Sequence, residues 1–226
     1  MILIEAAVAS KEEAEAAVAA GADRVELCEQ LEVGGVTPSA GLFESIRVAV
    51  PVWVLIRPRA GNFHYTIEEF ERLKREAAWF LDHGASGIVT GMLNADGTVD
   101  AIRSAEMARL ASGRIAFHRA FDETPDPLEA LETVIACGYR RILTSGGAAT
   151  AIDGAAALAT LIRAARGRIE ILPGGGVNPA NALDLIRRTG CTQLHGSFRC
   201  GAPATDPARI RELKKLLSSA AARGSS

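Results

Sequence analysis

The sequence predicts one α/β domain folded as an eight-stranded (β/α)8 barrel, also called a TIM barrel. Short apolar runs alternate with helical patterns eight times along the 226 residues, and successive runs begin roughly every 22 to 35 residues. Helix-capping signals separate the runs, and no linker rich in proline, glycine or serine interrupts the repeat. We therefore expect a single domain over residues 1–219, followed by a disordered tail over 220–226.

The expected strands are short and rich in aliphatic residues. The third, 51–56, is apolar throughout, as is typical of a parallel strand covered on both faces. The fifth leads from Arg114 into the segment 117–122, which reads Phe-His-Arg-Ala-Phe-Asp. The remaining strands are expected at 2–7, 24–28, 87–90, 140–144, 168–172 and 192–195.

Capping residues mark the expected helices. Ser10 and Glu13 form a capping box, and Gly21 ends the first helix. Asn178 followed by Pro179 is a typical helix start. Helices are therefore expected at about 10–20, 39–48, 66–83, 99–110, 126–137, 152–165, 178–189 and 206–217.

A doubly wound open sheet is the alternative with the same alternation of strands and helices. A dinucleotide-binding sheet of that type carries a G-x-G-x-x-G turn after its first strand. The segment 7–10 reads Ala-Val-Ala-Ser and contains no glycine. The barrel is therefore favoured.

The composition limits the classes of partner. Lys plus Arg number 25 and Asp plus Glu 27, so the nearly neutral chain has no general attraction for nucleic acid or an anionic membrane. The sequence has no run of about 18 apolar residues, and its first residues lack a basic signal-peptide region. The four cysteines include no C-x-x-C pair, which favours reduced thiols in the cytoplasm.

Polar residues are expected to gather at one end of the barrel. The carboxyl ends of all eight strands meet at one mouth, where barrel enzymes carry out their chemistry. The amino ends, by contrast, show mostly apolar or helix-ending residues. The candidates for acid–base catalysis at the mouth are Glu5, Glu26, His118 and Asp122.

A second group of mouth residues is suited to hold an anion. Guanidinium groups grip carboxylate or phosphate through parallel hydrogen bonds, and a glycine run before a helix start exposes backbone amides to an anion. A tight turn between strand and helix also explains such glycines, because it often needs positive φ. The candidates for anion binding are Arg57, Arg59, Arg119, Ser145, Gly174, Gly175, Gly176 and Ser197.

Cys28 and His118, which are both expected near the mouth, have structural interpretations as well as functional ones. Cys28 lies two residues after Glu26, so the two side chains share one face of the second strand. A buried cysteine is more often an inert small apolar residue than a ligand. His118 likewise fits either a hydrogen-bonded structural histidine or a functional one beside Arg119 and Asp122.

Several ordered segments resemble the CutC family, whose members are usually labelled copper homeostasis proteins. The resemblance implies a cytoplasmic single-domain barrel that forms a homo-oligomer and takes part in copper tolerance or trafficking. It also implies Cu(I) binding in some members, with Cys28 of the Glu-Leu-Cys motif as the metal ligand. The segments that carry it are 26–28, 34–39, 56–65, 117–122, 143–146 and 173–176.

The residues leave two functions open. Cu(I) prefers two or three thiolate or thioether ligands close together, but only Cys28 is clearly expected at the mouth, with Cys200 a weaker candidate. Arg57, Arg59 and Arg119 would repel a cation and attract a small anionic or phosphorylated metabolite. The second hypothesis is therefore a lyase, isomerase or hydrolase that acts on such a metabolite.

The third expected helix bears on assembly. Trp79 and Phe80 are adjacent, so at 3.6 residues per turn they do not both lie at the centre of one helix face. Packing against the barrel explains these aromatic residues in a monomer. If one of the two rings faces outward, a subunit contact in a dimer or tetramer explains it.

Overall fold

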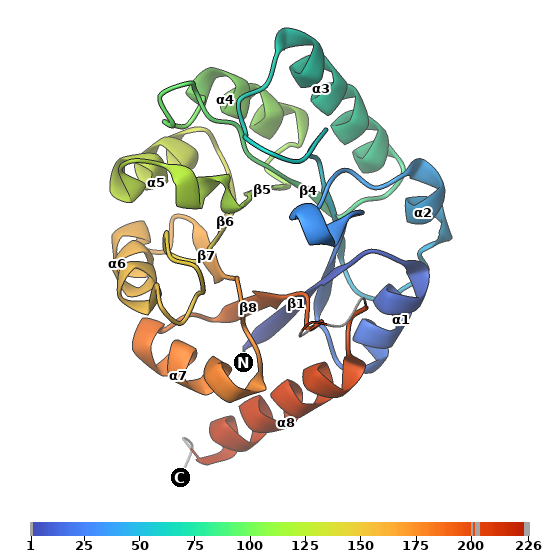
Figure 1. Ribbon diagram of the computed structural model, residues 1–226, viewed down its shortest axis with the longest axis vertical. Coiled ribbons are helices and arrows are strands. Elements are labelled where there is room, and N and C mark those ends of the chain that lie inside the picture. Colours follow the sequence, from blue (N-terminus) through green and yellow to red (C-terminus); the bar gives the residue numbers. More distant parts are fainter. Residues whose placement is uncertain (1, 200, 202–203, 224–226) are drawn as a thin grey trace.

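The computed structural model describes residues 2–199, 201 and 204–223. Within them, eight parallel strands alternate with eight α-helices, which surround the strands (Figure 1). The strands are β1 (Leu3–Val8), β2 (Arg24–Leu27), β3 (Val52–Leu55), β4 (Gly87–Thr90), β5 (Ile115–Phe117), β6 (Arg141–Thr144), β7 (Glu170–Pro173) and β8 (Gln193–Gly196). The helices are α1 (Lys11–Ala19), α2 (Ala40–Ser45), α3 (Ile67–Asp82), α4 (Ala101–Leu110), α5 (Pro127–Ala136), α6 (Ala155–Ala165), α7 (Pro179–Thr189) and α8 (Pro207–Arg223).

The strands pair side by side in chain order, and β1 also pairs with β8. Glu5 on β1 is in register with Arg24 on β2 and with His195 on β8. Strands β7 and β8 are neighbours, but their described residues form no backbone ladder. The sheet is thus a nearly closed barrel with one seam, which confirms the predicted fold class.

The predicted N-cap residues start the helices, but the Glu13 carboxylate accepts from the Ala9 N–H and not from that of Ser10, so the predicted capping box of α1 is incomplete. The Ser10 hydroxyl accepts a hydrogen bond of 3.1 Å from the Glu13 N–H at the start of α1. Thr66 and Glu69 form a reciprocal capping box on α3. Asn178 caps α7 directly before Pro179, whose ring fixes φ for the first turn. Ser10 and Asn178 lie close to the carboxyl ends of β1 and β7, whereas a longer loop separates Thr66 from β3.

Some boundaries differ from the expectation. Helix α2 ends at Ser45 because Ile46 is extended, and α6 begins only at Ala155 because Thr150 and Asp153 close a turn before it. After β5 the chain makes a 3-10 turn, η2 (Arg119–Glu123). Helix α8 continues to Arg223, into the segment expected to be a tail. No helix in the described ranges is both long and apolar enough to cross a lipid bilayer.

The hydrophobic core has two parts. The larger part lies between the helices and the outer face of the barrel. A smaller cluster lies inside the barrel and consists of Cys28, Trp53, Leu55, Val89 and Ala116. These residues come from β3, β4 and β5 and from the position directly after β2, so that side of the barrel interior is apolar.

Candidate functional site inside the barrel

A cavity of about 620 Å³ opens at the carboxyl ends of the strands. It is deep enough to reach side chains inside the barrel. Charged and polar side chains border it on several strands, as expected for the functional end of this fold. Its lining includes Glu26, Cys28, Arg57, His118, Arg119, His195 and Ser197.

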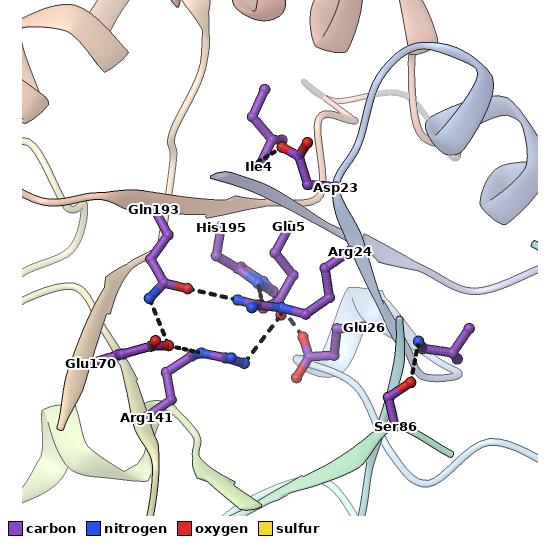
Figure 2. A network of polar contacts seen from close by, with 11 residues as sticks. Ile4, Glu5, Asp23, Arg24, Glu26, Ser86, Arg141, Glu170, Gln193 and His195 are labelled. Atoms are coloured by element: carbon purple, nitrogen blue, oxygen red, sulfur yellow. Dashed lines mark hydrogen bonds and ion pairs between the residues drawn. The ribbon is translucent and has the colours of Figure 1, made fainter. Parts of the chain in front are cut away.

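A buried network of charged side chains lies deeper in the barrel, and Glu5 is its centre (Figure 2). One Glu5 carboxylate oxygen accepts a hydrogen bond of 2.8 Å from His195 Nδ1. The other accepts from Arg24 Nε and lies 3.7 Å from Arg141 Nη1. Both oxygens of this glutamate are therefore held by cationic groups. The opposite ring nitrogen of His195 lies 3.5 Å from a carboxylate oxygen of Glu26.

The same network bridges the seam between β7 and β8. Gln193 Nε2 donates a hydrogen bond of 2.8 Å to the carboxylate of Glu170, and Gln193 Oε1 accepts one of 2.9 Å from Arg24. Arg141 Nε donates to the same Glu170 oxygen at 3.1 Å, and its guanidinium lies 4.5 Å from the centre of the Trp53 ring. Side-chain hydrogen bonds thus join two strands that lack a backbone ladder in the described residues.

Glu5 and Glu26 are both buried, but their pKa values move in opposite directions. Burial alone would raise the pKa of Glu5, yet the His195 hydrogen bond and the charges of Arg24 and Arg141 outweigh it and lower the pKa to about 2. Burial raises the pKa of Glu26 to about 7, and the negative charge of Glu5 adds to that effect. One carboxyl is therefore permanently ionised, while the other exchanges a proton near neutral pH.

His195 connects the two carboxyl groups. Burial lowers its pKa, but the hydrogen bond to Glu5 and the charges of Glu26 and Glu5 outweigh burial, so the pKa lies above its usual value. When Glu26 is ionised, the imidazolium form balances the network, because two arginines and one imidazolium then face three carboxylates. This neutrality lowers the cost of burying five ionisable groups together beside the exposed carboxylate of Glu170.

Three groups of this cluster are close enough together to be considered as metal ligands. One ligand atom each from Glu5, Glu26 and His195 lies within 4.8 Å of the others. However, both oxygens of Glu5 already accept from cationic donors, and Arg24 and Arg141 would repel a metal cation. The arrangement fits a shared proton better than a metal ion.

Cys28 lies at the cavity, as predicted. It is 1% exposed, and its thiol donates a weak hydrogen bond of 3.6 Å to the Val8 carbonyl. Burial raises the pKa of this thiol well above its usual value, and the charge of Glu26 adds to the shift. Cys28 is thus a protonated thiol at neutral pH. Cys200, the other predicted metal ligand, lies outside the described residues.

Arg57 lies at the cavity but is occupied with the backbone. Its guanidinium donates to the carbonyls of Val33, Gly35 and Gly61 at 2.8 to 3.2 Å, and it lies 4.8 Å from the centre of the Phe63 ring. It therefore ties two loops together at the mouth. Because these carbonyls already accept from Arg57, few of its N–H groups remain to bind an anionic ligand.

Arg59 does not line the cavity. Its Nε donates a hydrogen bond of 2.6 Å to Glu69, the capping-box residue of α3. Its Nη2 donates to the carbonyl of His64 at 2.8 Å and to the side chain of Asn62 at 3.2 Å. These bonds fold the loop between β3 and α3 and direct the guanidinium away from the predicted anion site.

His118 lies at the cavity with one nitrogen unpartnered. Its Nδ1 accepts a hydrogen bond of 3.1 Å from the Ala120 N–H, so the neutral ring carries its proton on Nε2. Burial and the charge of Arg57 lower the pKa of His118 to about 3. Nε2 is buried and has no hydrogen-bond partner in the described structure. His118 is therefore a neutral imidazole with a free buried donor.

Asp122 acts on the loop after β6. Its carboxylate accepts from the Thr144 hydroxyl at 2.5 Å, from the backbone N–H groups of Ser145 and Gly147 at 3.0 and 3.1 Å, and from Arg119 Nε at 2.7 Å. The Ser145 hydroxyl is likewise used, because it bonds Asp122, Arg119 and the Ala148 carbonyl. Asp122 and Ser145 thus hold a loop in place and do not line the cavity.

Arg119 and the glycine run form the opposite wall of the cavity. Gly175 and Gly176 have positive φ, and a Cβ at Gly175 would lie 3.4 Å from Arg119 Nη1. That nitrogen makes no hydrogen bond within the described residues, and neither do the backbone N–H groups of Gly175, Gly176 and Val177. Gly174 packs deeper, where a Cβ would lie 2.5 Å from Leu143.

A sequence model of the CutC family matches residues 2–200 of this chain. The chain belongs to the CutC family. A protein named CutC from Treponema denticola is 44% identical over 197 residues, which cover 86% of this chain and 80% of that protein. The human protein named copper homeostasis protein cutC homolog is 41% identical over 202 residues, which cover 87% of this chain and 73% of that protein.

Solved structures agree with this assignment. The crystal structure of CutC from Streptococcus agalactiae aligns with a TM-score of 0.81 and 31% identity, covering 87% of this chain and 99% of that one. The phosphoribosylanthranilate isomerase of Thermotoga maritima aligns with a TM-score of 0.63 at 14% identity, covering 97% of this chain and 100% of that one. At that identity the second match shows only the shared barrel fold.

Of the seven residues of the network in this CutC-family chain, only Glu5 and Glu26 were predicted from the sequence. Arg24, Arg141, Glu170 and Gln193 stand at the amino ends of their strands, which were expected to be mostly apolar or helix-ending. His195 is the last residue of the strand expected at 192–195 but was not among the candidate residues. The sequence signal that could have revealed these residues is the alternation of side chains along a strand. Arg24, Glu26 and Cys28 share the inner face of one strand. Gln193, His195 and Ser197 share the inner face of another.

Proposed function

We propose that this CutC-family chain acts in copper homeostasis and that Cys28 is the thiol through which it holds Cu(I) in the barrel cavity. The names of its relatives support the role, and the position of Cys28 on the cavity wall supports the ligand. Cu(I) favours thiolate ligands. Cys137, at the end of α5, and Cys191, before β8, do not line this cavity.

Copper uptake at Cys28 should displace the thiol proton. Burial and the charge of Glu26 raise the pKa of the thiol, so the proton is present throughout the neutral range. The affinity for Cu(I) should therefore increase about tenfold for each unit of pH, as expected for a metal that replaces one proton.

An anaerobic competition with a Cu(I) chelator tests this proposal. We expect Cys28→Ser to abolish stoichiometric uptake, whereas Cys137→Ser should take up copper as the parent does. Equal uptake by the parent and by Cys28→Ser would refute the assignment of the ligand.

A second candidate function is an enzyme that acts on a small anion. The observation that favours it is the wall formed by Arg119 and residues 175–177, where one guanidinium nitrogen and three backbone N–H groups are without partners in the described residues. Such a concave set of donors is suited to a carboxylate or phosphate group. Of the arginines predicted to bind an anion, Arg119 lies beside these backbone N–H groups, whereas three carbonyls of neighbouring loops accept from the terminal nitrogens of Arg57.

Thermal denaturation in inorganic phosphate tests the anion site. Phosphate should raise the midpoint temperature of the parent relative to chloride at equal ionic strength. Arg119→Lys should lose most of that increase, because an ammonium group does not replace the planar fork of the guanidinium. Arg59→Ala is the control and should keep the full increase, since Arg59 does not line the cavity. No increase in the parent would refute the anion site.

We further propose that the protein is cytoplasmic and forms a homo-oligomer. The absence of a C-x-x-C pair from the sequence supports the first point. For assembly, Trp79 is half-buried on α3 and stacks on His83 with ring centres 4.0 Å apart. Sedimentation of the parent and of Trp79→Ala checks the second point, and an unchanged oligomer would remove Trp79 from the interface.

A further inference from the structure

We propose that Glu26 and His195 are the acid–base pair of an active site that isomerises a small hydroxy-carbonyl anion, and that Glu5 positions His195 for this reaction. The inference goes beyond copper homeostasis and rests on the anion site proposed above. The conversion shifts hydrogen between two neighbouring carbon atoms of the substrate.

Glu26 is a buried carboxyl group without a hydrogen-bond partner in the described residues. Its side chain is 7% exposed and lines the cavity, yet its carboxyl makes no hydrogen bond within the described residues. Buried carboxyl groups are normally satisfied by hydrogen bonds, as Glu5 is. The contact of 3.5 Å to His195 Nε2 is longer than a normal hydrogen bond. Both atoms thus remain available to a ligand in the cavity.

The orientation of His195 comes from Glu5. The hydrogen bond of 2.8 Å from Nδ1 to Glu5 leaves Nε2 as the nitrogen on the Glu26 side. Arg24 and Arg141 hold the Glu5 carboxylate in turn. A carboxylate that fixes an imidazole in this way sets which nitrogen exchanges protons with a ligand. Glu5 does not line the cavity, so its role is to position His195.

His118 supplies a hydrogen-bond donor for a carbonyl oxygen. Its Nε2–H is buried without a partner in the described residues, and its ring packs 4.8 Å from that of Phe63. A buried donor without a partner is costly unless a ligand satisfies it. A carbonyl oxygen is a suitable acceptor, and a hydrogen bond from His118 would stabilise the negative charge that develops on it during proton removal.

The remaining wall holds the anionic end of the substrate. Arg119 Nη1 and the N–H groups of Gly175 and Gly176 border the same cavity and are unpartnered in the described chain. A substrate with a carbonyl, a neighbouring hydroxyl and a carboxylate or phosphate group therefore matches the three kinds of group that line the cavity.

The reaction balances without an added oxidant or reductant. The Glu26 carboxylate takes a proton from the carbon that bears the hydroxyl, and the His195 imidazolium gives its Nε2 proton to the carbonyl oxygen. In the resulting enediol, the hydroxyl group that was present in the starting substrate gives its proton to His195 Nε2 and becomes the new carbonyl. Glu26 gives its proton to the former carbonyl carbon. The substrate is isomerised, and both side chains recover their starting states.

Hydrogen exchange in D₂O tests the inference with dihydroxyacetone phosphate and ribulose 5-phosphate as probes. By NMR, we expect the parent to incorporate deuterium next to the carbonyl of at least one probe at least tenfold faster than buffer. Glu26→Gln should reduce the rate to that of buffer. This variant removes no hydrogen bond among the described residues, so it should fold. Cys137→Ser, prepared in the same way, should exchange as the parent does.

Two results would overturn the acid–base assignment. One is exchange by Glu26→Gln at the parent rate, and the other is exchange by the parent at the buffer rate with both probes. Neither result affects the copper competition with Cys28→Ser or the phosphate test with Arg119→Lys, so failure of this inference is distinguishable from failure of the proposed functions.

The pH profile of exchange tests the role of Glu5. The charged groups that face His195 are Glu5 on β1 and Glu26 and Arg24 on β2. Glu5→Gln removes a carboxylate that favours the imidazolium, so the alkaline limb of the profile should move to lower pH. Glu5→Asp keeps the charge and should restore the limb in part. A profile that Glu5→Gln leaves in place would overturn the positioning role.

Discussion

Glu5 and Glu26 lie on neighbouring strands and approach opposite nitrogens of one imidazole, that of His195. Glu5 is 2.8 Å from Nδ1 and Glu26 is 3.5 Å from Nε2. Arg24 and Arg141 contact Glu5 and keep it ionised. The result is a fixed carboxylate and a proton-exchanging carboxyl on either side of one ring.

The pKa of Glu26 predicts a dependence of stability on pH. An acid whose pKa rises from 4.5 in the unfolded chain to about 7 in the folded protein binds more protons when folded, so its contribution is lost as pH rises through that interval. Glu26→Gln should therefore be more stable than the parent at pH 8, by about 1–3 kcal/mol, and not at pH 4.5. Urea denaturation at several pH values measures this. The exposed Glu212→Gln is the control, and the same pH slope in Glu26→Gln would contradict the prediction.

Gln193 should stabilise the seam of the barrel. Gln193→Ala leaves the buried Arg24 without one hydrogen bond and also removes one from the exposed carboxylate of Glu170, so we expect a loss of about 1–3 kcal/mol in the free energy of unfolding. Thr192→Ala removes an exposed side chain directly before the same strand and should be nearly neutral. Equal stability of the two variants would show that the side-chain bridge contributes nothing to barrel closure.

Gly91 should resist substitution because His118 occupies the adjoining space. A Cβ at Gly91 would lie 2.7 Å from His118 Nδ1 and 2.9 Å from the Phe117 ring. Gly91→Ala should therefore destabilise the protein by about 1–3 kcal/mol. Gly41 in α2 has no atom within 4 Å of its Cβ position, and Gly41→Ala should stabilise by about 0.5–1 kcal/mol. Thermal denaturation of both variants decides this, and a gain at Gly91 would be inconsistent with the packing described.

Asp122 should matter for stability more than for chemistry. Its carboxylate accepts hydrogen bonds from Thr144, Ser145, Gly147 and Arg119. The amide of Asp122→Asn accepts at only one of its two atoms, so we expect a loss of about 2–4 kcal/mol in chemical denaturation. Glu123→Gln, at the exposed neighbouring position, should change stability little. Unchanged stability of Asp122→Asn would instead favour a role in the reaction.

Much of the fold follows from local features of the sequence. The alternation of apolar runs with capped helices predicted the eight strands and their barrel, because each cap acts within one turn of its own residue. Helix α2 shows the limit of such signals. It ends three residues before the predicted boundary, since the extended backbone of Ile46 serves packing that the local pattern does not reveal.

The candidate site was predicted in part. Glu26, Cys28, His118, Arg119 and Ser197 do lie at the cavity, because the carboxyl ends of parallel strands meet at one place. Arg59 and Asp122 follow strands in the same way, but neither lines the cavity. Arg59 donates a hydrogen bond to Glu69 instead, and Asp122 accepts hydrogen bonds from the loop after β6.

The sequence by itself determined the barrel, the membership of the CutC family and the end at which polar groups gather. Only the tertiary structure decided which of those groups act together. Glu5 and His195 are 190 positions apart along the chain but in register on β1 and β8. Coulomb energy and hydrogen bonding depend on distances of a few ångströms, and closure of the barrel sets those distances. The opposite pKa shifts of Glu5 and Glu26 therefore arise from the fold and not from any local motif.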